Sequence, residues 1–243
     1  MENKKNKQVA TVGGKDIAEV KSGYAAASAN MAAIFAEEMD GLTPQFDRIK
    51  IPSGGGLAYE VPGADADNPD SVKEFRAVIL YHHPINTYYK EKYTGGNTPP
   101  DCGSFDGHYG IDSATGEVKE CKSCPFSKFG SGENEIGKAC KQKRRVYLLR
   151  ESEVLPIILT LPTGSLSDFS KYVMRLLSKG KKTNSVVTKF TLKKEQNTGG
   201  ITYSVAVCAV DRDLTAQELP VIEGMSIQVK ALASKVTDSG DEE

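Results

Sequence analysis

Short stretches of apolar residues bounded by turn residues recur along the chain and predict strands. The clearest covers 74–81, where apolar side chains fill all but two positions after a polar loop. Two further strands at 185–194 and 201–210 surround the turn Asn-Thr-Gly-Gly at 197–200, which is typical of a hairpin. Shorter strands are expected at 57–61 (in a hairpin with the residues before a Pro-Ser-Gly-Gly-Gly turn), 146–149 and 155–161.

Apolar residues recur at helical spacing in three places. The stretch 165–180 begins with Ser-Leu-Ser-Asp, which resembles a capping box with Asp in place of Glu. An alanine-rich stretch predicts a helix over 18–39. A last helix is expected over 214–234, where Pro220 and Gly224 predict a break or a kink.

This pattern predicts a mixed, mainly β fold. Several short strands with one helix placed late between them suit an OB-type β-barrel with added helices, whose open face is crossed by loops. We expect residues 1–16 to be disordered and residues 17–236 to form one OB-like domain. The stretch 98–141 is rich in turn residues and lacks apolar periodicity, so it is expected to be an insertion; 237–243 forms an acidic tail.

Composition changes this picture little. The chain has 243 residues, of which 39% are hydrophobic and 26% are charged, as in ordinary globular proteins. It contains no run of 18 apolar residues and no signal-peptide pattern, so we expect no membrane association and a cytoplasmic location. Thiols stay reduced there, and clustered cysteines bind metal more often than they form disulfides.

Charge is unevenly distributed along the chain, although the net charge is only −1. Residues 119–150 contain nine Lys and Arg against three acidic residues, and residues 165–194 contain eight against one. The last seven residues carry four acidic residues and no base. A basic middle predicts an anionic ligand. The tail is expected to occupy the basic surface in the absence of that ligand and, once displaced, to recruit replication or recombination proteins.

Four of the five cysteines lie within one 39-residue stretch. They leave loops of 18, 2 and 15 residues, a spacing that predicts a closed tetrahedral Zn²⁺ site. An iron–sulfur cluster, disulfides and unligated thiols are the alternatives, and His108 could replace Cys102 or Cys140 as a ligand. The expected ligands are Cys102, Cys121, Cys124 and Cys140.

Features typical of enzymes are weak. The fifth cysteine, Cys208, lies in an apolar strand and is expected in the core. No histidine is followed two residues later by Glu, as a zinc deaminase requires, and a four-cysteine site has no open position for substrate. The run 132–138 matches the start of a P-loop, but Ala139 stands where Ser or Thr should bind Mg²⁺. We therefore expect no catalytic activity.

Aromatic and basic residues are interleaved around the cysteines. Aromatic faces stack on unpaired bases and basic side chains bind phosphates, so the combination predicts binding of single-stranded nucleic acid without sequence preference. Taken singly, each tyrosine is more commonly a packing residue. The expected contact residues are Tyr81, Tyr88, Tyr89, Tyr93, Phe126, Lys128, Phe129, Lys141, Lys143, Arg144, Arg145, Lys181 and Lys182.

Three runs carry a resemblance: Cys102-Gly-Ser-Phe-Asp-Gly107, Cys121-Lys-Ser-Cys-Pro-Phe-Ser-Lys-Phe-Gly-Ser131 and Gly137-Lys-Ala-Cys-Lys141. They resemble the cysteine segment of single-stranded DNA-binding proteins carried by bacteriophages and mobile elements. The design is more distantly similar to the helix-destabilising protein of T-even phages, which has a zinc subdomain within an OB fold and an acidic tail. That pattern uses three cysteines and a histidine, whereas this chain offers four cysteines. The specific match covers about residues 100–161.

The resemblance implies a non-enzymatic protein that coats unpaired DNA during replication or recombination. The alternative is a zinc-stabilised module that binds another protein, such as a host polymerase or a defence factor. An enzyme, for example a nuclease, is a third possibility, and it is disfavoured because no carboxylate cluster or histidine pair with metal-site spacing stands out.

Overall fold

The strands form one large mixed sheet. The computed structural model describes residues 23–26, 37–38, 45–63, 65, 68–91, 99–151, 153–197 and 199–233. Within them, nine strands share one sheet: β1 (Arg48–Ile49), β4 (Glu74–Tyr88), β5 (Cys102–Ser104), β6 (Tyr109–Asp112), β7 (Val118–Glu120), β8 (Lys141–Leu149), β9 (Ile157–Leu161), β10 (Val186–Gln196) and β11 (Thr202–Asp213). A separate pair consists of β2 (Tyr59–Val61) and β3 (Asp70–Val72).

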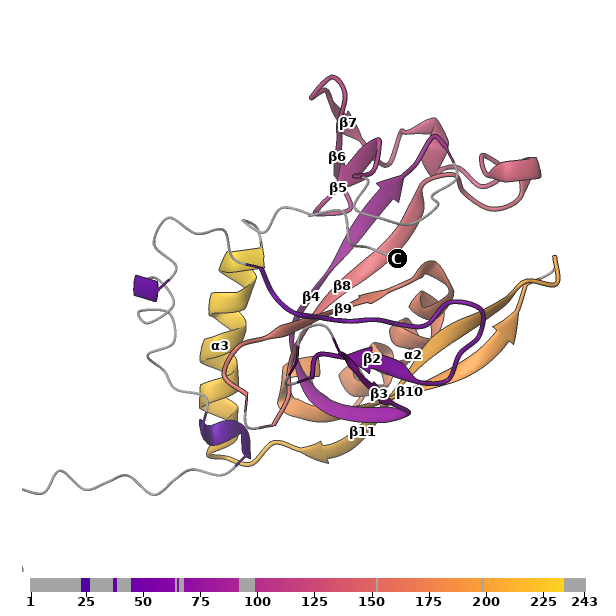
Figure 1. Cartoon of the computed structure of the whole chain (residues 1–243). Coiled ribbons are helices and arrows are strands. Elements are labelled where there is room, and N and C mark those ends of the chain that lie inside the picture. The colour runs from indigo at the N-terminus through magenta and orange to yellow at the C-terminus, as the bar shows by residue number, and fades with distance from the viewer. Residues whose placement is uncertain are drawn as a thin grey trace, which may run out of the picture.

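The long strand β4 organises this sheet. Its residue Val78 is paired with β8 and β10 at the same time, and Asn86 is paired with β8 and β5. Because a strand has two edges, β8 occupies one, while β10 and β5 follow each other along the second. The hairpin of β10 and β11 therefore lies near one end of β4, and β5, β6 and β7 extend the sheet at the other end (Figure 1).

A bulge in β4 decides which side chains share a face. Ile79 is paired with Leu148 and Tyr81 with Tyr147, so Leu80 is an extra residue on the β4 side. Val78 and Leu80 both pack in the cluster around helix α3 (Glu218–Ala233). An extra residue reverses the alternation, so His82 and the even-numbered residues after it point to the face covered by helix α2 (Leu166–Leu177).

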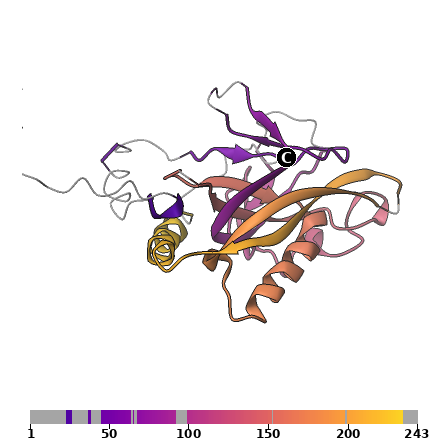
Figure 2. The ribbon, with the colours of Figure 1, turned by 90° about the horizontal axis from the view of Figure 1, so that it is seen from below.

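Two helices cover the two faces. Helix α2 (Leu166–Leu177) buries Phe169, Tyr172 and Leu176 against the cluster that includes Ile79. Helix α3 (Glu218–Ala233) buries Ile222, Met225, Val229 and Ala233 in the other cluster. Figure 2 shows the two helices at separate sides of the sheet. Short 3₁₀ turns complete the fold: η1 (Gly23–Ala26), η2 (Pro125–Ser127), η3 (Glu133–Glu135), η4 (Thr163–Ser165) and η5 (Thr183–Ser185).

The strand predictions are confirmed, and several strands are longer than expected. The stretch 74–81 is only the first half of β4, because the polar residues His82 and His83 continue the same strand. The hairpin predicted around 57–61 reduces to one bridge, in which Lys50 and Glu60 exchange two backbone hydrogen bonds. The hairpin of β10 and β11 pairs along its whole length.

Two predictions about helices are wrong. Ser165 does not cap α2, because its buried Oγ accepts a hydrogen bond from the Ala206 amide at 2.9 Å, and β11 thus takes the hydroxyl that the capping box needs. Helix α3 runs without interruption through Pro220 and Gly224. Pro220 is tolerated because it lies in the first turn, where a backbone N–H has no partner within the helix.

The fold is mainly β, as predicted, with a large mixed sheet and added helices. In the described part of the chain, no strand pairing joins the two ends of the sheet, so closure into a barrel is not found.

Some predicted features lie outside the described residues: the stretch 1–16, the tail 237–243 and Tyr93. So does most of the helix predicted over 18–39, of which only η1 and residues 37–38 are described. Among the residues that are described, no helix combines the length and the apolar character needed to cross a membrane.

Candidate metal pocket and nucleic-acid groove

The four clustered cysteines meet at the far end of β4. Cys102 opens β5 and is paired with Tyr88, the last residue of β4. Cys121 follows β7 directly, Cys124 precedes η2, and Cys140 precedes β8. All four line one pocket of ≈ 280 Å³, which we call the cysteine pocket.

Backbone contacts place the cysteines around this pocket. The Cys121 amide donates to the His108 carbonyl at 2.8 Å, and the Cys140 amide donates to the Phe126 carbonyl at 2.9 Å. Gly110 lets two sulfurs approach, because a Cβ at this position would lie 2.8 Å from Cys102 Sγ and 3.7 Å from Cys121 Sγ. A side chain at position 110 would therefore displace the thiol of Cys102.

Burial and mutual repulsion disfavour charged thiolates in this pocket. Burial raises the pKa of Cys102, and the neighbouring thiolates raise it further. The same causes raise the pKa of Cys140 to about 11. A divalent cation would supply the positive charge that stabilises four neighbouring thiolates, so the set of four cysteine donors fits Zn²⁺. In the arrangement described here, however, no three His, Cys, Asp or Glu side chains of the described residues are grouped closely enough to hold a metal ion.

His108, the alternative ligand, and the fifth cysteine both lie outside the cysteine pocket. His108 lines a neighbouring hollow and not the cysteine pocket. Cys208 is buried in β11, as predicted, and burial raises the pKa of its thiol to about 12.

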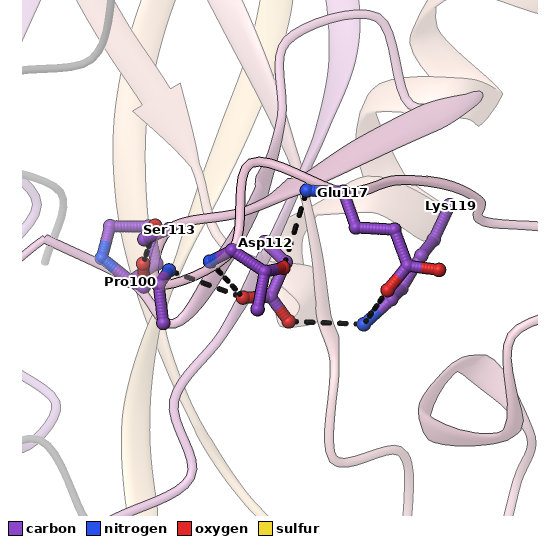
Figure 3. A network of polar contacts seen from close by, with 7 residues as sticks. Pro100, Asp112, Ser113, Glu117 and Lys119 are labelled. Carbon is purple, nitrogen blue, oxygen red and sulfur yellow. Dashed lines mark hydrogen bonds and ion pairs between the residues drawn. The ribbon is translucent and has the colours of Figure 1, made fainter.

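A polar network braces the hairpin of β6 and β7 beside the pocket (Figure 3). The Lys119 ammonium lies 3.0 Å from the Asp112 carboxylate and 3.3 Å from that of Glu117. The hydrogen bond from Lys119, together with that from the Thr115 amide, lowers the pKa of Asp112 to about 2. Ser113 Oγ donates to the Pro100 carbonyl, which ties the hairpin to the start of the cysteine segment.

Two of the predicted aromatic residues pack on each other. The rings of Tyr88 and Phe126 are stacked with 4.2 Å between their centroids, and both line the cysteine pocket. Tyr88 is half-buried, whereas 42% of Phe126 is exposed. Phe129 is 83% exposed on the loop that follows η2.

A second hollow of ≈ 410 Å³ lies between the sheet and α2. The sheet contributes His82, Lys143 and Arg144, and none of the described residues that line this hollow is acidic. A third hollow of ≈ 380 Å³ is lined by Tyr109 and Lys122 of the cysteine segment, together with the acidic residue Glu120. These two hollows share three residues, so we treat them as one groove; the shared residues are Asn86, Gly107 and Gln142.

Three side chains form a cluster at the α2 end of the groove. The Arg144 guanidinium lies 2.6 Å from Nδ1 of His82, and its central carbon lies 6.0 Å from the centroid of the Phe169 ring. The His82 ring meets the Phe169 ring edge-on at 5.2 Å. Burial, followed by the nearby Arg144, lowers the pKa of His82 to about 4. At neutral pH the imidazole is uncharged, so Nδ1 can accept the hydrogen bond from Arg144.

The structure separates the predicted nucleic-acid residues. Arg144 lines the groove, but its neighbour Arg145 is fully buried, with 0% of its side chain exposed, because successive residues of β8 point to opposite faces. Lys143 also borders the groove, although the same alternation places its side chain on the Arg145 face of β8. Arg145 is therefore not accessible to a ligand in the groove. Tyr81 is half-buried in a stack with His83 and lies on the α3 face.

The remaining basic residues that were predicted to bind nucleic acid lie outside the groove lining. Lys128 and Lys141 are exposed, and the Lys141 ammonium donates to the Lys138 carbonyl. Lys181 forms an ion pair with Asp213 at 2.6 Å, and Lys182 is its neighbour after α2. Tyr89 directly follows β4 and is half-buried.

Sequence reasoning missed several groove residues: Tyr109, His82, Asn86, Phe169 and Met174. Tyr109 could have been predicted from the sequence, because it is an aromatic residue in a polar segment. In the structure 58% of it is exposed. The others come from two elements far apart in the sequence, and no local pattern indicates that these elements meet. Comparisons of the chain with family models, with curated proteins and with solved structures found no match.

Proposed function

We propose that this protein binds single-stranded DNA without sequence specificity and has no catalytic activity. The proposal includes a role in coating unpaired DNA during replication or recombination of a bacteriophage or mobile element. The observation that carries it is the groove, whose half between α2 and the sheet has basic and apolar lining residues but no acidic one among those described.

The chemistry of the groove suits a flexible polyanion. Lys143 and Arg144 lie on the sheet side, and Lys122 lies at the far end. Each basic side chain that meets a phosphate releases counterions, so affinity falls as salt is added. The hydrogen bond from Arg144 to His82 holds the guanidinium over the Phe169 ring and limits the rotamer freedom that binding would otherwise remove.

We propose that Zn²⁺ occupies the cysteine pocket, held by Cys102, Cys121, Cys124 and Cys140. A closed four-thiolate site supplies structure and not chemistry, because it leaves no open coordination position. Zinc would cross-link β5 to the end of β7, η2 and the start of β8, and the last three of these elements contribute residues to the groove. An OB-type relationship and recruitment of partners by the acidic tail remain parts of the proposal.

The direct test is a fluorescence anisotropy titration of the full chain with oligo-dT and with duplex DNA over a series of salt concentrations. We expect tighter binding to oligo-dT and a steep loss of affinity with salt. Lys122→Glu, at an exposed position that lines the groove, is expected to weaken binding roughly tenfold at low salt. Lys230→Glu on the exposed side of α3 changes the net charge equally and serves as the control. Equal effects of both variants, or no binding to oligo-dT, would overturn the proposal.

One observation favours the interaction module as a second candidate. Phe129 and Ile136 are 83% and 64% exposed on one loop, and Gly130 and Gly137 close that loop with a 2.7 Å backbone hydrogen bond. Exposed apolar side chains on one loop are typical of a site that binds another protein. Indifference to oligo-dT together with capture of a purified replication or defence protein, lost in Phe129→Ala, would favour this candidate.

A further inference from the structure

The two walls of the groove differ in chemistry. Gln142 and Arg144 lie two residues apart on β8, so their side chains share the face that borders the groove, and Lys143 lies between them. The opposite wall is helix α2, which contributes Leu166, Phe169, Val173 and Met174. Single-stranded DNA has the same two-sided character, with charged phosphates on one side and apolar base faces on the other.

Resting on the proposed function, we infer that bases face α2 while phosphates lie along β8, and that Met174 is the side chain against which a base packs. The charge of β8 favours this orientation, because bases on that wall would leave phosphates against the uncharged helix side chains. The occupant is thus an unpaired base of single-stranded DNA.

Burial decides which residue of the α2 wall meets the base. Phe169 is 3% exposed, and its ring is already contacted by His82 edge-on and by the Arg144 guanidinium. Val173 is partly buried and packs on the core. Met174 is 62% exposed and lines the groove, so its side chain is accessible to a ligand.

The thioether of methionine suits a binder without sequence preference. Its chain is unbranched and flexible, and its polarisable sulfur makes favourable contacts with aromatic rings. It can adjust to purines and pyrimidines alike because it offers no hydrogen-bond pattern that would read a base edge. A contact with Met174 therefore accepts an unpaired base of any identity.

The chain offers a matched control for Met174. Leu177 lies three residues later on α2, is 55% exposed, and is not among the residues that line the groove. Truncation of either side chain to alanine removes exposed apolar surface from the same helix. Only one of the two truncations changes the groove.

The experiment measures the affinity of the full chain for oligo-dT and for an abasic oligonucleotide of the same length. Met174→Ala is expected to weaken binding to oligo-dT by about two- to tenfold and to leave binding to the abasic strand unchanged. Leu177→Ala is expected to change neither affinity. Thermal unfolding of both variants, compared with that of the unsubstituted protein, checks that α2 stays folded.

The outcomes separate the two proposals. Equal affinity of the unsubstituted protein for the two strands would overturn the base-facing wall and leave DNA binding intact. The base-facing wall would also be overturned if Met174→Ala weakened binding to oligo-dT and to the abasic strand equally, or weakened binding to neither strand. Failure of the unsubstituted protein to bind any single strand would overturn the proposed function itself.

Discussion

Asn86 of β4 and Gln142 of β8 are paired across the sheet at the point where the two hollows of the groove join. Asn86 also lines the cysteine pocket, is only 4% exposed, and donates through Nδ2 to the Gly107 carbonyl at 3.2 Å. It therefore contacts both candidate sites. Its hydrogen bond to Gly107 ties β4 to the cysteine segment beside the groove.

Replacing Asn86 should destabilise the fold more than replacing its partner. Asn86→Ala leaves the Gly107 carbonyl without this donor, and we expect the free energy of unfolding to fall by about 1–3 kcal/mol. Gln142→Ala, on an exposed position, should change it by no more than about 0.5 kcal/mol. Denaturant unfolding followed by circular dichroism measures both, and similar values for the two variants would contradict the role of Asn86.

Metal removal tests the cysteine pocket. We expect about one Zn²⁺ per chain by elemental analysis, and a fall in melting temperature after chelation because the metal stabilises only the folded state. A variant with Cys121→Ser and Cys124→Ser should lose the metal. Cys208→Ala should retain it, because Cys208 lies in the core and not in the pocket. Iron in place of zinc, or no metal in protein prepared under reducing conditions with zinc present, would refute the assignment.

The salt dependence reports individual phosphate contacts. Lys122→Ala should make the slope of log affinity against log salt less negative by about 0.7, the value for one phosphate of a single strand. Lys230→Ala should leave the slope unchanged, since Lys230 lies on α3 away from the groove lining. The measurement is a set of anisotropy titrations with oligo-dT, and an unchanged slope for Lys122→Ala would place the DNA elsewhere.

The cluster around His82 predicts a stability that depends on pH. The pKa of His82 is lowered to about 4 in the folded protein, whereas an unfolded histidine titrates near 6.5. Between these values the unfolded chain binds the extra proton, so this stabilisation is complete above pH about 6.5 and is lost as the pH falls towards 4. Arg144 and His83 both oppose a charge on His82 and act in the same direction.

His82→Gln isolates this contribution, because glutamine can accept from Arg144 without titrating. The unsubstituted protein should lose on the order of 2–3 kcal/mol between pH 6.5 and 4.5 beyond the loss seen in His82→Gln. Denaturant unfolding at several pH values provides the comparison. Parallel stability curves for the two proteins would show that the pKa of His82 does not change on folding and would contradict the cluster described above.

Much of the β framework follows from local sequence patterns. The apolar run that starts β4 and the hairpin around Asn197 are recognisable because period-two alternation and turn residues are local properties. The capping box at Ser165 misled for a physical reason: a hydroxyl next to a strand can bond to that strand and not to its own helix. Pro220 misled because the position of a proline within the first turn depends on where the helix begins.

The sequence by itself determined the strands, the cysteine-bearing insertion and the basic character of 141–145, because spacing and composition are read along the chain. Only the tertiary structure decided that Arg144 lines the groove while its neighbour Arg145 is buried. It also decided that Met174 lines the same hollow as Arg144. The bulge at Leu80 and the packing of α2 set these positions, and both depend on contacts between segments that are distant in the chain.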